Sequence, residues 1–210
     1  MGRYEDTLFI FTSDNGPETY DRGGAGTPYP YRGWKGGVLE GSHRVAGLME
    51  WPRRIPSNGE VNGLASSLDF AVTFRDLFRQ ENPNVLLTAN DVLRDGISLL
   101  PMFSSPQTWQ RSEAWAICRP IAYQDFRFCD QFAYTVGKWK IIATRRQSGD
   151  YTIKNVQLYD LETDIDEEHN VATQNPEIFN SMIRPAVEWV NNITLSYKEG
   201  CPPNPLVHVD

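Results

Sequence analysis

The residues best suited to chemistry stand near the start of the chain, where an apolar run stops at Asp14 and Asn15. Residues 7–13 are mostly apolar, β-branched or aromatic, which predicts a buried strand that ends at the turn-forming Asn15-Gly16 pair. Open α/β sheets bind ligands at the carboxyl ends of their strands, and carboxylate and amide oxygens suit a hard cation such as calcium. The alternative is an Asx turn, in which both side chains bond only their own backbone.

A Gly-rich segment follows and carries a second group of candidate side chains. Lys35 lies within it, and Glu40, His43 and Arg44 come directly after it. A lysine keeps its charge at neutral pH, so Lys35 could bind an anionic ester group while charge builds up on it. An exposed loop lysine without a function is the alternative.

In this order, the residues resemble the sulfatase family, most closely the arylsulfatase A type. In that family, a strand ending in Asp-Asn-Gly is followed by a Gly-rich segment, a lysine, a Glu-Gly pair and an arginine. Lys35, Glu40 and Arg44 stand in this register, whereas His43 is unexpected and Ala46 replaces the usual proline. Further along, a helix led by an Asp and a Leu-Tyr-Asp-Leu strand followed by a polar turn also resemble the family, at Asp69, 158–161, Asp164 and Asn170.

The resemblance implies a hydrolase that cleaves sulfate esters, on a small molecule or a sulfated sugar. It assigns Asp14 and Asn15 to a calcium or magnesium site and gives Lys35 a catalytic and sulfate-binding role. His43 and Arg44 are candidate substrate-binding residues. The family suggests a secreted, periplasmic or lysosomal location, but the sequence itself leaves the location unknown.

The family's nucleophile is a formylglycine made from the first residue of a Cys or Ser, any residue, Pro, any residue, Arg motif. No such motif occurs in this chain, and neither does a strand that ends in paired aspartates. We therefore expect the chain to be the C-terminal part of a sulfatase, inactive alone and completed by an N-terminal portion.

Composition narrows the remaining function classes. The 210 residues are 40% hydrophobic, which is enough for a core, and the net charge of -7 without a basic tract argues against nucleic acid. No apolar run is long enough to span a membrane. Two rivals stay open: a phosphate or phosphonate ester hydrolase of the alkaline phosphatase superfamily, and a non-catalytic binding module.

The elements that must position these residues form an α/β arrangement. We expect the closing part of an alkaline-phosphatase-like sheet in residues 1–80, a connecting loop in 81–110, and an antiparallel subdomain with one helix in 111–210. Within the first part, strands are predicted at 7–13 and 45–51, and a helix at 69–80 with Asp69 as its cap. The aromatic face of that helix, formed by Phe70, Phe74, Leu77 and Phe78, is predicted to be core.

The C-terminal part is predicted to hold strands at 114–120, 131–144 and 156–161, with a hairpin turn at Gly137. An amphipathic helix is expected at 178–193, kinked or delayed by Pro185. The odd number of cysteines allows one disulfide, for example between Cys118 and Cys129 on neighbouring strands, or three thiols. The acidic stretch 160–168 fits a calcium loop poorly and is interpreted as a solvated turn, and no chemistry is assigned to His169.

Overall fold

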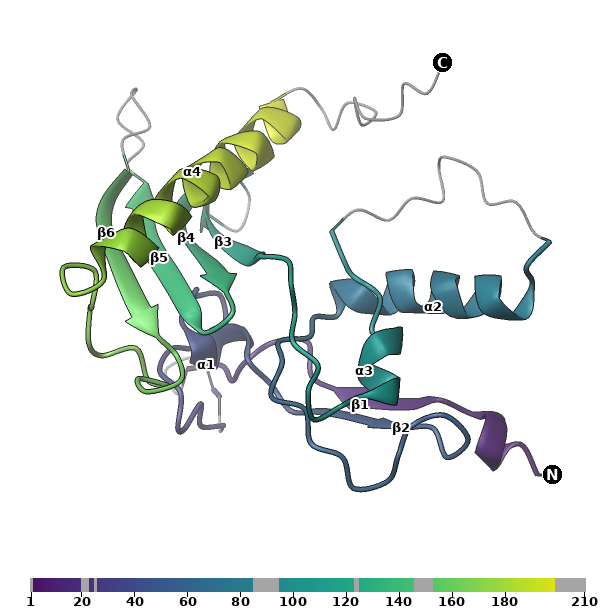
Figure 1. The fold of residues 1–210 in the computed structure, drawn as a ribbon. Coiled ribbons are helices and arrows are strands. Elements are labelled where there is room, and N and C mark those ends of the chain that lie inside the picture. The colour runs from purple at the N-terminus through teal and green to yellow at the C-terminus, as the bar shows by residue number, and fades with distance from the viewer. Residues whose placement is uncertain are drawn as a thin grey trace, which may run out of the picture. The chain divides into compact units, whose positions relative to one another are not determined.

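The computed structural model describes residues 2–19, 23–24, 26–84, 95–122, 125–145 and 153–198 (Figure 1). Its contacts divide the chain into two compact units, each built from two separate stretches of sequence. Unit 1 comprises Met1–Phe11 and Gly47–Glu113, and unit 2 comprises Thr12–Ala46 and Ala114–Asp210. The segment with the candidate site residues therefore belongs to the same unit as the C-terminal sheet. The division into domains at residues 80 and 110 stays a prediction.

Unit 2 is built on a four-stranded antiparallel sheet in the order β3-β4-β5-β6. Its strands are β3 (Trp115–Ala122), β4 (Asp125–Val136), β5 (Trp139–Arg145) and β6 (Ile153–Asp160). The predicted hairpin is confirmed between β4 and β5, where Val136 pairs with Trp139. Gly137 has a φ of 56° in this turn, a left-handed conformation that glycine adopts without steric cost.

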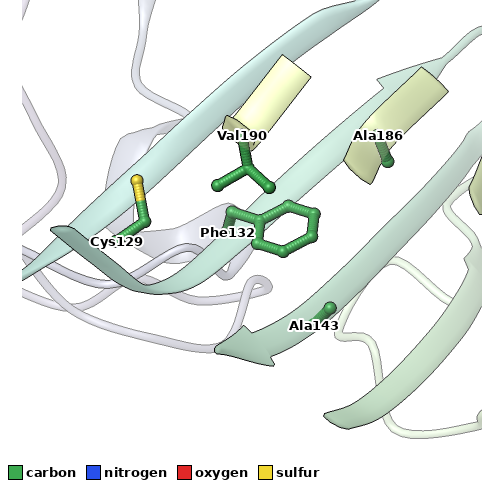
Figure 2. Packing of buried hydrophobic residues seen from close by; sticks show 5 residues of the cluster. All are labelled: Cys129, Phe132, Ala143, Ala186 and Val190. Atoms are coloured by element: carbon green, nitrogen blue, oxygen red, sulfur yellow. The ribbon is translucent and has the colours of Figure 1, made fainter. Parts of the chain in front are cut away.

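The helix α4 (Pro176–Lys198) packs on one face of this sheet (Figure 1). It confirms the predicted C-terminal helix and continues through Pro185. Figure 2 shows how side chains of β4, β5 and α4 meet in the core between them: Cys129, Phe132, Ala143, Ala186 and Val190. Cys129 also forms a disulfide with Cys118 on β3, so the disulfide alternative is the one that the structure shows.

The opposite face of the sheet is covered by the segment that carries the short helix α1 (Glu40–His43). Val38 packs there against Ala133 of β4, Ile142 of β5 and Tyr159 of β6. Because side chains alternate along a strand, Ile141 points toward α4 while Lys140 and Ile142 point toward this segment. The Gly-rich segment is thus held by the sheet that follows it much later in sequence.

Unit 1 contains a 3-10 helix (Tyr4–Asp6), a two-stranded sheet of β1 (Phe9–Thr12) and β2 (Gly47–Glu50), and the helices α2 (Leu68–Glu81) and α3 (Leu100–Ser104). The predicted helix is confirmed to within a residue, and both predicted strands are found but are shorter. The second half of the segment expected as a connecting loop at 81–110 contains α3 and contributes a buried cluster of Leu99, Met102, Phe103 and Trp109. Residues 85–94 of that loop lie outside the described residues.

Three local expectations for unit 1 are wrong. The strand β1 is not buried, since Phe9 and Phe11 are 46% and 66% exposed, and only β2 pairs with it among the described residues. The aromatic face of α2 is not simple core, because Phe74 and Phe78 are also exposed. Asp69 does not cap α2: it lies inside the helix and binds Arg111 instead. Within the described residues, no helix is long and apolar enough to cross a membrane.

Candidate functional site

The turn after β1 presents Asp14 at the surface and Asn15 half-buried. Asp14 Oδ1 accepts a hydrogen bond from the backbone N–H of Asn15 at 2.9 Å and one from Ser13 Oγ at 3.3 Å. Asn15 Nδ2 donates to the carbonyl oxygen of Gly16 at 2.9 Å. Both side chains thus bond the backbone of the next residue, and among the described residues these bonds leave Asp14 Oδ2 and Asn15 Oδ1 unengaged.

Two backbone hydrogen bonds bring this turn to the other candidate residues. The N–H of Gly16 donates to the carbonyl of Ser42 in α1 at 2.9 Å, and the N–H of Lys35 donates to the carbonyl of Pro17 at 3.0 Å. The Lys35 side chain is exposed, and no carboxylate in the described part of the chain pairs with it. The order Asp-Asn-Gly, lysine, Glu-Gly in sequence thus becomes one contiguous loop assembly in unit 2.

The donor atoms of this turn fit a hard cation, but only in part. Calcium takes six to eight oxygen ligands, and Asp14 and Asn15 supply two side chains of the right chemistry. Across the described residues, no group of three or more His, Cys, Asp or Glu side chains could hold a metal ion. A calcium or magnesium site at Asp14 and Asn15 stays a prediction.

Beneath the loop assembly lies a buried group of charges that sequence reasoning missed. Lys140 of β5 is fully buried, and its Nζ lies 2.7 Å from Glu40 Oε1 and 2.8 Å from Glu167 Oε1. Glu167 is also fully buried, and its Oε2 accepts the backbone N–H of Glu40 at 2.7 Å. One ammonium group thus serves two carboxylates, which come from the loop segment and from the turn after β6.

Burial and neighbouring charges shift the pKa values of Glu40 and Glu167 in opposite directions. Burial by itself favours the neutral acid at Glu40, but Lys140, His43 and Arg44 outweigh it and hold the pKa of Glu40 below its ordinary value. At Glu167, burial is the stronger effect and raises the pKa, although Lys140 opposes it. Two acids that share one cation in this way differ in their tendency to ionise, and Glu40 is the stronger acid.

His43 lies beside this group rather than out in solvent. Its ring packs against Trp115 with 4.7 Å between centroids, and its Nε2 is 3.3 Å from the carbonyl oxygen of Val38 and 3.5 Å from Lys140 Nζ. Burial and the neighbouring Lys140 lower the pKa of His43 to about 4. A ring that is neutral at pH 7 is a poor proton donor there, and a substrate contact by His43 stays a prediction.

The other candidate, Arg44, is exposed and stays close to its own segment. Its guanidinium lies 4.8 Å from the centre of the Tyr31 ring and 3.4 Å from Glu40 Oε2. Substrate binding by Arg44 also stays a prediction.

Arg32, which was not singled out from sequence, connects the loop to the acidic turn. Its Nε donates to the carbonyl of Asp166 at 3.0 Å, and its Nη2 donates to that of Glu167.

The acidic stretch is not a solvated turn as predicted. Besides Glu167, Asp164 is buried, and its carboxylate accepts the backbone N–H groups of Glu168 and His169 at 3.1 and 2.9 Å. His169 Nδ1 lies 3.2 Å from Asp164 Oδ1, so the histidine that was given no role pairs with this carboxylate. Asn170 Oδ1 accepts the N–H of Leu158, which closes the turn onto β6. The sequence held one indication of the buried charges around Lys140, because this lysine comes directly before Ile141 and Ile142, which are both buried.

Sequence comparison with known proteins identifies the family to which the chain is similar. Residues 1–80 match the family model for "Sulfatase". Human arylsulfatase A is 40% identical over 102 residues, which cover 49% of this chain and 18% of that protein. An N-acetylgalactosamine-6-O-sulfatase of Bacteroides thetaiotaomicron is 28% identical over 193 residues, covering 83% of this chain and 34% of that protein. The chain belongs to the sulfatase family.

The solved structures agree with this assignment. The crystal structure of Ps i-CgsB in complex with k-i-k-neocarrahexaose superposes on 90% of this sulfatase chain with a TM-score of 0.69 and 26% identity. The match covers 37% of that chain. The expected fold class, a partial α/β sulfatase fold with an antiparallel C-terminal sheet, is therefore confirmed. The sulfatase chain spans about a fifth to two fifths of the length of the relatives described here.

Proposed function

We propose that this chain is the C-terminal part of a sulfatase, and that the complete protein hydrolyses sulfate esters with a nucleophile supplied by a preceding portion. The observation that supports this most is the loop assembly in unit 2, where the backbone of Gly16 bonds that of Ser42 in α1 and the backbone of Lys35 bonds that of Pro17. Family membership gives the reaction class. The loop gives the side chains that would act on the sulfate group.

Asp14 and Asn15 are proposed to hold calcium or magnesium together with ligands from the preceding portion. When bound, such a cation polarises the oxygens of an ester. Lys35 is proposed to bind a sulfate oxygen and to stabilise the negative charge that grows on it as the S–O bond breaks. Formylglycine, expected outside this chain, would supply the nucleophile.

A sulfated sugar is the substrate class that the relatives support. One relative is named an N-acetylgalactosamine-6-O-sulfatase, and a structural neighbour was solved with a neocarrahexaose. We propose a sugar with a sulfate ester for this chain, with simple aryl sulfates as artificial substrates. His43 and Arg44 are proposed contacts, and a secreted, periplasmic or lysosomal location is proposed on family grounds.

The surface of unit 1 supports the proposed preceding portion. Large apolar side chains stand in exposed positions on β1, β2 and α2, and those of the two strands line a common hollow: Phe9, Phe11 and Leu48 on the strands, and Leu68, Phe74 and Phe78 on the helix. Exposed apolar patches of this kind mark surfaces that bind other protein elements. Covering them with the preceding portion would remove this apolar surface from water.

The test compares the complete protein with the 210-residue chain. We expect the complete protein to hydrolyse 4-nitrophenyl sulfate and N-acetylgalactosamine 6-sulfate, with loss of activity on adding a chelator, and the chain alone to be inactive. Faster hydrolysis of 4-nitrophenyl phosphate would instead favour the phosphate ester hydrolase. Chelator-sensitive turnover by the chain alone would contradict the proposal.

A calcium titration of the chain alone separates the remaining alternative. A sulfatase part that holds only two of the ligands binds calcium weakly. Tight calcium binding by the 210 residues would show an independent site and would favour a non-catalytic binding module.

A further inference from the structure

We propose that Lys140 is a positioning residue, which acts through Glu40 and Glu167 to hold α1 in the place that sets the Asp14-Asn15 turn and Lys35. Its effect on catalysis rests on the proposed sulfatase function. The geometric part of the proposal does not, and it can be tested without any enzymatic activity.

The buried charges of Lys140, Glu40 and Glu167 are unfavourable to assemble. Lys140 and Glu167 are completely buried and Glu40 nearly so, and they lie on the same face of the sheet as the apolar cluster of Val38 and Ile142. Moving three charges out of water is unfavourable, and well-packed apolar residues often replace such groups without loss of stability. A methionine could fill the space of Lys140 on this face, so packing alone does not require the charge. What the charge adds is a directed contact to two specific oxygens.

Glu167 has an unusual backbone conformation. Its φ is 57°, in the left-handed region that non-glycine residues avoid. This conformation places its side chain so that Oε1 meets Lys140 and Oε2 accepts the N–H of Glu40. Glu167 therefore interacts with α1 in two ways. It accepts a hydrogen bond from the backbone of Glu40, and it shares the ammonium group of Lys140 with the Glu40 side chain. Residues in rare backbone conformations concentrate at places with a functional constraint.

Backbone hydrogen bonds connect α1 to the candidate site. Ser42, two residues after Glu40, accepts the N–H of Gly16, and Gly41 donates its N–H to the carbonyl of Arg32 at 2.8 Å. Pro17, next to Gly16, accepts the N–H of Lys35. A shift of α1 consequently moves the turn with the proposed cation ligands, and the loop with Lys35 follows through Pro17.

The rival explanation is that Lys140 merely stabilises the sheet. Hydrogen exchange of backbone amides in the 210-residue chain distinguishes the two, with Lys140→Met as the variant. We expect the amides of Gly16 and Lys35 to exchange at least about tenfold faster than in the unaltered chain, and to accelerate clearly more than those of β4 and β5, which also accelerate because the variant leaves two buried carboxylates without their cation. Equal acceleration across the sheet would show a purely structural role, and unchanged exchange at Gly16 and Lys35 would overturn the proposal.

Lys138→Met is the matched control, because Lys138 belongs to the same hairpin. It is exposed and pairs with Asp160 and Glu162 at 2.8 and 3.1 Å, without contact to α1. We expect no selective change at Gly16 or Lys35 in this variant. Selective acceleration there in Lys138→Met would contradict the assignment to Lys140.

A milder variant keeps the test decisive if Lys140→Met does not fold. Glu167→Gln preserves the shape of the side chain and leaves the Lys140 to Glu40 pair in place. We expect faster exchange at Gly16 and Lys35 in this variant too, by about threefold. No change at either amide in a folded Glu167→Gln protein would also overturn the proposal.

The same variants in the complete protein separate positioning from the proposed function. If the complete protein is a sulfatase, Lys140→Met should lower kcat for 4-nitrophenyl sulfate and weaken activation by calcium, whereas Lys138→Met should change neither. A complete protein without sulfatase activity would refute the proposed function and leave the exchange result intact. An active sulfatase in which Lys140→Met keeps its kcat would refute the catalytic part of this inference alone.

Discussion

A Cβ atom built on Gly16 would lie 1.9 Å from the carbonyl oxygen of Gly41, so the turn that carries Asp14 and Asn15 rests directly on the backbone of α1. Real atoms do not approach so closely, and the obstacle is backbone rather than a flexible side chain. Only glycine allows the turn and α1 to meet in this way.

Gly16→Ala should therefore push the turn away from α1 and destabilise unit 2. Forcing an extra methyl group into a tight contact typically costs about 1–3 kcal/mol, which urea unfolding of the 210-residue chain would measure. Gly47→Ala is the control, because a Cβ at Gly47 would meet nothing within 4 Å. Equal unfolding midpoints for Gly16→Ala and the unaltered chain would contradict this reading of the contact.

Unit 1 depends on a buried ion pair between Asp69 and Arg111. Arg111 Nη1 donates to both carboxylate oxygens at 2.8 and 3.0 Å, and Asp69 also accepts the N–H groups of Ser66 and Ile97. Arg111→Met should leave the carboxylate buried without its cation and lower the free energy of unfolding by about 3–5 kcal/mol. Arg184→Met, which breaks an exposed pair on α4, should barely shift the urea midpoint. Similar losses in both variants would count against the buried pair.

His43 predicts a loss of stability on mild acidification. Its pKa is about 4 in the folded chain and about 6.5 when unfolded, so between these values only the unfolded chain takes up the proton. The free energy of unfolding should fall as the pH is lowered through this window, by about 2 kcal/mol from pH 7 to pH 5, and level off below pH 4. His43→Asn should flatten this part of the profile measured by urea unfolding.

His169 supplies the control for that profile. Its hydrogen bond to Asp164 raises its pKa, which is the opposite direction, so its contribution is present below the unfolded pKa and lost as the pH rises. His169→Asn should therefore leave the acid-side loss in place. A profile that stays steep in His43→Asn would show that other groups cause the loss.

Asp14→Asn in the complete protein should remove chelator-sensitive sulfatase activity, because an amide has lost the charge that favours a divalent cation. Glu18→Gln, a change of the same kind in the same segment, should keep that activity. Turnover of 4-nitrophenyl sulfate at several calcium concentrations is the measurement. Unchanged activity and unchanged calcium dependence in Asp14→Asn would show that Asp14 is not a ligand.

The order of Asp14, Lys35 and Glu40 could be interpreted from sequence because the motif is contiguous over about thirty residues. The hairpin at Gly137 and the helix α4 were also predictable, since local turn chemistry and periodicity determine them. Lys140 and Glu167 were not, because their burial depends on partners far away in sequence.

The exposed strand β1 is the reverse case. Its apolar residues predict burial, and this prediction is wrong because burial is decided by what packs on the strand. In the described residues only β2 pairs with it, and Phe11 remains in water. An apolar side-chain pattern indicates that a strand is suited to burial, but it does not show whether another element packs on that strand.

The contact between Lys140 and Glu40 joins residues 100 positions apart, and Glu167 lies later still. During synthesis on a ribosome, the loop with Lys35 emerges before the sheet and before the turn after β6 that support it in the folded chain. The segment that resembles an active site most clearly thus depends on residues that are made after it. A premature stop codon just before Glu167 would spare every proposed ligand and still leave the loop unsupported.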